Sequence, residues 1–257
     1  MMEGMFPSGD GVLSHGFDLR PEWWRMRVPE PWSSFLSELP PSERGRGYHR
    51  ITRADMFVRG EDNSPHGNGR LLVACYAWGT GSSAWLVPLR ARVFRDTAPG
   101  VIGTRLSEAR RILDAQGPAE AYASLTDGGP NRIKHMRASF FTKFLYAADA
   151  NSVRSTGRAL ILDRFVVVAL NALHQWGLQE RGPWSPETYQ RWIEHAEREA
   201  AEASRVARPI GSDAVEMSYS NKVGNSLERL RSDSGTPSQQ ASMSARHRSS
   251  TRDVMVC

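Results

Sequence analysis

Cysteines and long apolar runs are scarce in this sequence. Its 257 residues include two cysteines, Cys75 and Cys257, too few for a disulfide framework, a cysteine-rich zinc site or a four-cysteine iron–sulfur cluster. The longest apolar runs, Leu71–Trp78 and Phe165–Leu170, fall far short of the roughly 20 residues that span a bilayer. Residues 1–11 show no basic stretch followed by an apolar one. We therefore expect a cytoplasmic protein with no secretory signal and no membrane partner.

Lysine is also scarce. The chain has 33 Lys+Arg against 28 Asp+Glu, a formal net charge of +5. Only Lys134, Lys143 and Lys222 are lysines, which leaves 33 − 3 = 30 arginines. Arginine stays protonated in proteins, whereas a desolvated lysine can act as a nucleophile. Any mechanism that needs a lysine therefore has few candidates.

Composition divides the chain into one core and two tails. From Val206 the sequence is serine-rich and loses its periodic apolar residues, so residues 206–257 are predicted to be mostly disordered. Residues 1–20 are predicted to be flexible, and Glu61–Arg70 to form a loop because of its Gly, Pro and Asn content. The remainder, residues 21–205, is predicted to fold as one all-α domain.

Apolar periodicity predicts the helices of that domain. The expected ranges are Ser107–Gln116, Ala119–Leu125, Ser139–Ala148, Arg164–Trp176 and Pro186–Arg205. The helix over 139–148 is expected to have an apolar aromatic face and an opposite face that carries Lys143. The run Leu71–Trp78 is equally compatible with a buried strand and a buried helix.

The sequence does not support a nucleotide or metal site. Trp78–Gly81 (WGTG) lacks the Lys-Ser/Thr ending of a P-loop and the third glycine of a dinucleotide fingerprint, so we interpret it as a structural turn. His135, His174 and His195 show no recognisable ligand spacing, and each is expected on the surface or at a helix end. We therefore expect neither a metal nor a cofactor.

Residues 121–171 contain the side chains best suited to catalysis and to DNA binding. Two predicted helices are joined by a basic connection with Arg132, Lys134 and Arg137, which can offer cations and backbone N–H groups to a DNA phosphate. Lys143 on the second helix and Asp163 before the next supply a nucleophile and a carboxylate. Ordinary alternatives are a solvated basic loop, a solvated Lys143 and an Asp163 that only caps a helix.

In this segment, MRASFFTKFLYAADA (136–150) and ALILDRFVVVAL (159–170) resemble the core of the helix-hairpin-helix 8-oxoguanine DNA glycosylases, and most closely their bacterial members. The resemblance implies an all-α helix-hairpin-helix bundle that acts as a monomer on double-stranded DNA containing a damaged base, within the nucleoid. Such enzymes extrude the damaged nucleotide and cleave its N-glycosidic bond. Their catalytic aspartate maps onto Asp163, and Lys143 is the first candidate for the lysine that attacks C1′ in bifunctional members.

The chain departs from the family pattern in two places. The family hairpin usually carries glycines just before its second helix, whereas Lys134–Ala138 contains none. The nucleophilic lysine usually begins that helix, around residues 136–139, whereas Lys143 comes one or two turns later. Two alternatives therefore stay open: a non-catalytic DNA-binding protein on the same fold, and an enzyme for another modified base in DNA or RNA.

Overall fold

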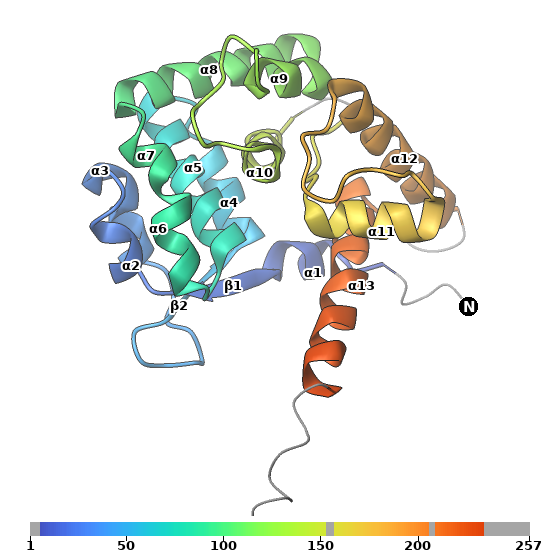
Figure 1. The fold of residues 1–257 in the computed structure, drawn as a ribbon, viewed down its shortest axis with the longest axis horizontal. Coiled ribbons are helices and arrows are strands. Elements are labelled where there is room, and N and C mark those ends of the chain that lie inside the picture. Colours follow the sequence, from blue (N-terminus) through green and yellow to red (C-terminus); the bar gives the residue numbers. More distant parts are fainter. Residues whose placement is uncertain (1–5, 153–156, 206–208, 234–257) are drawn as a thin grey trace, which may run out of the picture.

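The regular secondary structure of the described residues is almost entirely helical (Figure 1). The computed structural model describes residues 6–152, 157–205 and 209–233. The elements up to residue 95 are α1 (Gly9–Ser14), β1 (Gly16–Leu19), α2 (Glu22–Arg25), α3 (Glu30–Ser33), the 3-10 helix η1 (Ser34–Ser37), β2 (His49–Thr52), α4 (Arg53–Gly60), α5 (Pro65–Thr80), the 3-10 helix η2 (Ala84–Leu86), α6 (Val87–Arg90) and α7 (Arg92–Arg95). They are followed by α8 (Pro99–Gln116), α9 (Pro118–Leu125), α10 (Ala138–Ala148), α11 (Arg164–His174), α12 (Pro186–Ser204) and α13 (Ser212–Asp233). The all-α prediction is confirmed, with one small antiparallel sheet of β1 and β2 in the described residues.

Helices α5 and α10 lie at the centre of the molecule. Helix α5 packs against α4, α8 and α10, and it is buried from Leu71 to Trp78, as an all-round apolar helix should be. Tyr76 of α5 stacks on Phe140 of α10 with ring centroids 4.0 Å apart. In Figure 1, α10 is seen nearly end-on between α4–α8 on one side and α11–α13 on the other. The ambiguous apolar run is therefore a buried helix.

The predicted helix boundaries hold closely for α9, α10 and α12, but three other predictions need correction. Helix α8 starts at Pro99, a residue suited to the first turn of a helix, and so begins eight residues before the predicted Ser107. Helix α11 ends at His174 because Gln175 takes a left-handed φ of 54°. Glu61–Arg70 is a loop only up to Ser64, because that side chain accepts a hydrogen bond from the backbone N–H of Gly67 and Pro65 opens α5. A serine followed by proline is a strong helix start, and the loop-like composition concealed it.

The prediction of a flexible segment over residues 1–20 is wrong for its second half. Residues 9–14 form α1, and β1 pairs with β2 in the register Gly16↔Thr52 to Leu19↔His49. Leu19 is fully buried. The strand is formed by a partner about thirty residues away, which local composition does not reveal.

The prediction of disorder from residue 206 is wrong over α13. Val215 and Tyr219 are buried, one helical turn apart, and α13 packs against both α11 and α12. This apolar face is narrow and interrupted by serines, so the helix owes its stability to tertiary packing rather than to its own periodicity. Residues 1–5, 206–208 and 234–257 lie outside the described part of the chain.

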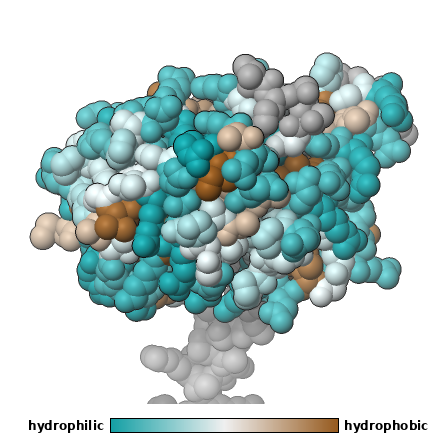
Figure 2. All heavy atoms as spheres, turned by 90° about the horizontal axis from the view of Figure 1, so that it is seen from above, coloured by the Kyte–Doolittle hydropathy of each residue, from teal (hydrophilic) through white to brown (hydrophobic). Residues whose placement is uncertain are grey.

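The described surface is polar on the face that Figure 2 shows, where hydrophobic residues occur only as small separate spots. Among the described helices, none combines the length and the apolar character that crossing a bilayer requires.

Candidate active site

Lys143 and Asp163 form a buried ion pair in the middle of the molecule. Lys143 Nζ lies 2.7 Å from Asp163 Oδ2, and the two side chains are only 5% and 16% exposed. The same ammonium donates to the backbone oxygen of Ser139 at 2.9 Å. The interpretation of Lys143 as a solvated surface lysine is therefore wrong, because the helix face that carries it packs inward.

Asp163 uses its two carboxylate oxygens for separate tasks. Oδ1 accepts from the backbone N–H groups of Phe165 at 3.0 Å and Val166 at 3.4 Å, which caps α11, while Oδ2 accepts from Lys143. Burial alone raises the pKa of this carboxyl, but the Lys143 ammonium and the two N–H donors outweigh it and hold the pKa below its ordinary value. The capping role and a chemical role are thus compatible in one residue.

Aromatic rings and one glycine enclose the lysine. Lys143 Nζ lies 5.7 Å from the Trp78 ring centroid and 5.9 Å from that of Phe140. A Cβ on Gly79 would lie 3.0 Å from Phe140 and 3.3 Å from Lys143 Cδ and Cε. Glycine therefore gives the lysine stem room to reach Asp163. The predicted turn over residues 78–81 is wrong for its first part, because α5 continues through Thr80 and only Gly81, at φ 52°, turns away.

A second ion pair lies deeper, between the start of α4 and α13. Arg53 Nη1 lies 2.6 Å from Glu216 Oε2, with both side chains buried, and it also donates to the Tyr146 hydroxyl at 3.2 Å. Burial raises the pKa of Glu216, although Arg53 opposes that effect, and the charges of Asp163 and Lys143 act on the same carboxyl. The last helix therefore contributes charge to the surroundings of the Lys143–Asp163 pair. Sequence analysis missed Glu216 because it lies in the segment predicted to be disordered.

The basic connection forms a hairpin between α9 and α10. Its three cations, Arg132, Lys134 and Arg137, are exposed, whereas Ile133 and Met136 between them are buried. Arg132 is paired with Asp127 at 2.6 Å. Helix α10 starts without a side-chain cap, so its first N–H groups are available to an anion. The hairpin therefore presents three exposed cations beside an uncapped helix start, and their contact with DNA phosphate stays a prediction.

His135 occupies an unusual backbone conformation in that hairpin. Its φ is 68°, in the left-handed region where glycine is normally favoured, and its Nε2 lies 2.8 Å from Asp96 Oδ2. The contact with Asp96 therefore accompanies a backbone conformation that a residue with a side chain rarely adopts. The absence of hairpin glycines has not removed the hairpin.

A cavity of about 600 Å³ lies between the hairpin and residues 181–186. Its lining includes three aromatic side chains and four cations: Tyr122, Phe141, Trp184, Arg132, Lys134, Arg137 and Arg181. Lys143 and Asp163 do not line it, and Ser139 is the residue that touches both the cavity and the ion pair. The structure therefore places the three predicted DNA-binding cations around the cavity. It places the two predicted catalytic residues, Lys143 and Asp163, in contact with each other outside the cavity lining.

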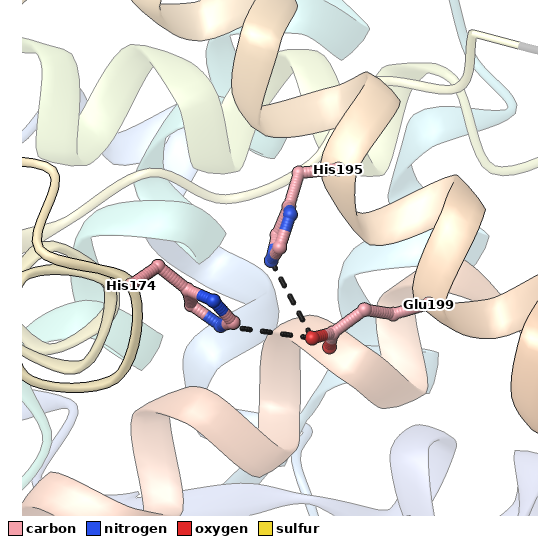
Figure 3. A group of neighbouring side chains, drawn as sticks. All are labelled: His174, His195 and Glu199. Atoms are coloured by element: carbon pink, nitrogen blue, oxygen red, sulfur yellow. Dashed lines mark ion pairs between the residues drawn. The ribbon is translucent and has the colours of Figure 1, made fainter.

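The histidines of α11 and α12 form another cluster that the sequence did not predict. His174 and His195 both point toward Glu199, as Figure 3 shows. His174 is at a helix end, as expected, but His195 lies within α12. His195 and Glu199 are four residues apart on a predicted helix, and this spacing was the available signal.

The family model described as "Putative 8-oxoguanine DNA glycosylase OGG-like protein" matches residues 10–219. The chain therefore belongs to this family, and the resemblance of residues 136–170 is confirmed over a far longer stretch. The match runs from α1 into α13, so it includes residues 10–20 and 206–219 of the two predicted tails. No curated protein and no solved structure gives a significant match. At family level the chain is a DNA-binding protein of glycosylase type.

Proposed function

We propose that this protein is a DNA glycosylase that removes a damaged purine of the 8-oxoguanine type, with Asp163 as its catalytic carboxylate. The observation that carries the proposal is the contact between Lys143 Nζ and Asp163 Oδ2 at 2.7 Å. It joins the two residues that the family resemblance selects, in a site largely closed to water. Such a site strengthens electrostatic stabilisation of a cationic transition state.

Asp163 serves the reaction as an ionised group. Because its pKa is held below the ordinary value, its negative charge is present at neutral pH and stabilises the oxocarbenium character that develops at C1′. The bond from C1′ to the purine nitrogen breaks, its electron pair leaves with the base, and the departing base takes up a proton. Either water or Lys143, once its ammonium has given up a proton, forms the new bond to C1′. Asp163 accepts the proton that the nucleophile loses and passes it on to the departing base, so that protons balance over the step.

Exposed aromatic side chains lie near the ion pair and suit an extruded base. Phe165, two residues after Asp163, and Phe17 are each 40% exposed. Phe17 contacts Trp78 edge-to-face at 5.1 Å, and Trp78 in turn faces Lys143. Stacking on an aromatic ring stabilises a base by about 1–3 kcal/mol. We propose that these rings hold the flipped base while Arg132, Lys134 and Arg137 hold the DNA backbone of a nucleoid-bound monomer.

One observation favours the alternative of a DNA-binding protein without catalysis. Lys143 is held by two hydrogen bonds and nearly closed to solvent, and the large cavity lies on the hairpin side rather than over the pair. A lysine in that state must release Asp163 before it can attack. A monofunctional glycosylase that uses water avoids this step.

The test is base release from a duplex that contains 8-oxoguanine, with and without borohydride. Asp163→Asn keeps the cap and is expected to lower the single-turnover rate by about 10²–10⁴-fold, whereas Asp114→Asn, on the exposed face of α8, leaves it unchanged. Trapping that disappears in Lys143→Gln assigns the nucleophile. Duplex binding that weakens with salt and with Arg137→Ala, without base release from any lesion in a panel, would overturn the enzymatic proposal in favour of the binding protein.

A further inference from the structure

The cluster at the far end of α11 has the composition of a metal site. His174 is the last residue of α11, and His195 and Glu199 lie one turn apart on α12. One ligand atom from each lies within 4.8 Å of the others, and both rings point at the same carboxylate in Figure 3. Two imidazoles and one carboxylate are a common donor set for zinc.

Tyr219 of α13 adds a fourth polar atom, its hydroxyl oxygen, to the cluster. Its hydroxyl lies 2.6 Å from His174 Nε2, 3.1 Å from His195 Nε2 and 2.8 Å from Glu199 Oε1. Glu199 Oε1 lies 3.6 Å from His174 Nε2 and 3.5 Å from His195 Nε2. Ligands about 2.05 Å from a tetrahedral zinc ion are about 3.3 Å apart. The five separations scatter around that value, so only small side-chain movements would seat an ion.

We propose that His174, His195 and Glu199 bind a divalent first-row transition-metal ion of the zinc class, with the Tyr219 oxygen at the fourth corner. The ion would join α11, α12 and α13 at one point. This inference does not depend on the proposed glycosylase activity, because the cluster shares no residue with the Lys143–Asp163 pair.

The local electrostatics are consistent with a bound cation. The C-terminal end of α11 carries a partial negative charge that favours cations. Lys222 on α13 opposes binding, because its ammonium lies 5.5 Å from the Tyr219 ring centroid and acts on His174. Its side chain is exposed, so water and salt screen this repulsion.

A bound ion would hold α13 in place. Helix α13 carries Glu216, the partner of the buried Arg53, and Tyr219 lies one turn further along the same helix. Metal binding to the folded state alone stabilises it by mass action. We therefore place in this cluster a structural metal site that secures the last helix of the family domain.

The experiment uses the full chain without an affinity tag, treated with EDTA, dialysed and titrated with Zn²⁺ by calorimetry. One ion per chain is expected, and Tm should rise by roughly 5–10 °C at a free Zn²⁺ concentration of 100 times Kd. Substitution with Co²⁺ should give the visible absorption of a tetrahedral ion. Lys222→Gln should tighten binding a few-fold.

Matched variants separate this site from other zinc contacts. His195→Ala and Glu199→Gln are expected to weaken Zn²⁺ binding more than about 100-fold. This loss is larger than the one expected for a residue that only hydrogen-bonds to a metal ligand. His66→Ala and Glu202→Gln change exposed residues outside the cluster and should bind as the wild type does. Glu199→Gln keeps the side-chain shape, and circular dichroism checks that it is folded. Wild-type affinity in the folded Glu199→Gln protein, or no stoichiometric binding by the wild type, would show that the cluster is only a hydrogen-bond network.

Discussion

The two ends of α11 carry the two polar clusters that matter most in this molecule, and they differ in kind. At the first end Asp163 caps the helix and pairs with Lys143. The other end is about 16 Å away, because the helix has eleven residues. There His174 lies close to His195 and Glu199. The first cluster joins a helix cap to a neighbouring helix within a recognisable segment. The second is formed by three helices, and its last component comes from α13.

Both ends follow the same electrostatic rule. A helix favours negative charge at its N-terminal end and positive charge at its C-terminal end. The carboxylate of Asp163 occupies the first position, and the proposed metal ion would occupy the second. One helix, buried only along its middle, therefore orients two sites of opposite preference.

Removal of α13 should have the largest effect, because it damages the second cluster and the deep ion pair together. A chain that ends at Arg205 lacks Glu216 and leaves the buried Arg53 without its carboxylate, which costs about 3–5 kcal/mol. Tm is expected to fall by about 10 °C or more. Thermal unfolding followed by circular dichroism measures this. Glu216→Gln should reproduce much of the loss and Glu202→Gln none of it, so an unchanged Tm in the shortened chain would contradict the assigned role of α13.

Substitutions in one cluster at a time should show that the Lys143–Asp163 pair, at the N-terminal end of α11, contributes more to the free energy of unfolding than the histidine cluster at the C-terminal end. Lys143→Met leaves the largely buried Asp163 without its cation and is expected to lower the free energy of unfolding by about 3 kcal/mol. Without metal, His195→Ala removes one hydrogen bond from a network that stays partly solvated and should cost about 1 kcal/mol. Urea denaturation in EDTA measures both. The reverse order would mean that, without metal, the histidine cluster at the C-terminal end of α11 contributes more to stability than the Lys143–Asp163 pair does.

Lowering the pH should also destabilise the surroundings of the two ends of α11 to different extents. Burial, with help from Arg53 and Arg50, lowers the pKa of His15 from 6.5 to about 4, and this ring packs on Trp78 near Lys143. Because the folded protein disfavours the protonated ring, stability is present above pH 6.5 and is lost as the pH falls toward 4. His174, which faces His195, Glu199, Tyr219 and Lys222, should contribute a smaller loss that also begins below 6.5.

The same titration should leave the Lys143–Asp163 pair intact until lower pH. The folded pKa of Asp163 lies below 3.8, so its contribution is complete above that value and is lost only as the pH falls further. Tm measured in EDTA between pH 8 and 4 tests this order. His15→Gln is expected to flatten the curve more than His174→Gln, and equal curves for all three proteins would contradict the assignment.

Sequence analysis selected two side chains that the structure places in contact, but it misplaced several boundaries of the fold. The capping position of Asp163 was predictable because this residue directly precedes an apolar helical run. The burial of Lys143 was not predictable, because it depends on Gly79 and Trp78 of another helix. Helix α13 was missed for a related reason: Tyr219 and Glu216 gain their partners only in the folded chain. Local composition carries information about neighbours in sequence, and these residues are stabilised by distant ones.

The left-handed His135 has a consequence for recognising hairpins of this kind. A left-handed backbone costs a residue with a side chain about 1–2 kcal/mol, and here the contact with Asp96 helps to hold the chain in that shape. The family model matches the chain although residues 134–138 contain no glycine. A tethered histidine can therefore hold a left-handed turn, and the lack of glycine in a sequence does not exclude a hairpin at that place.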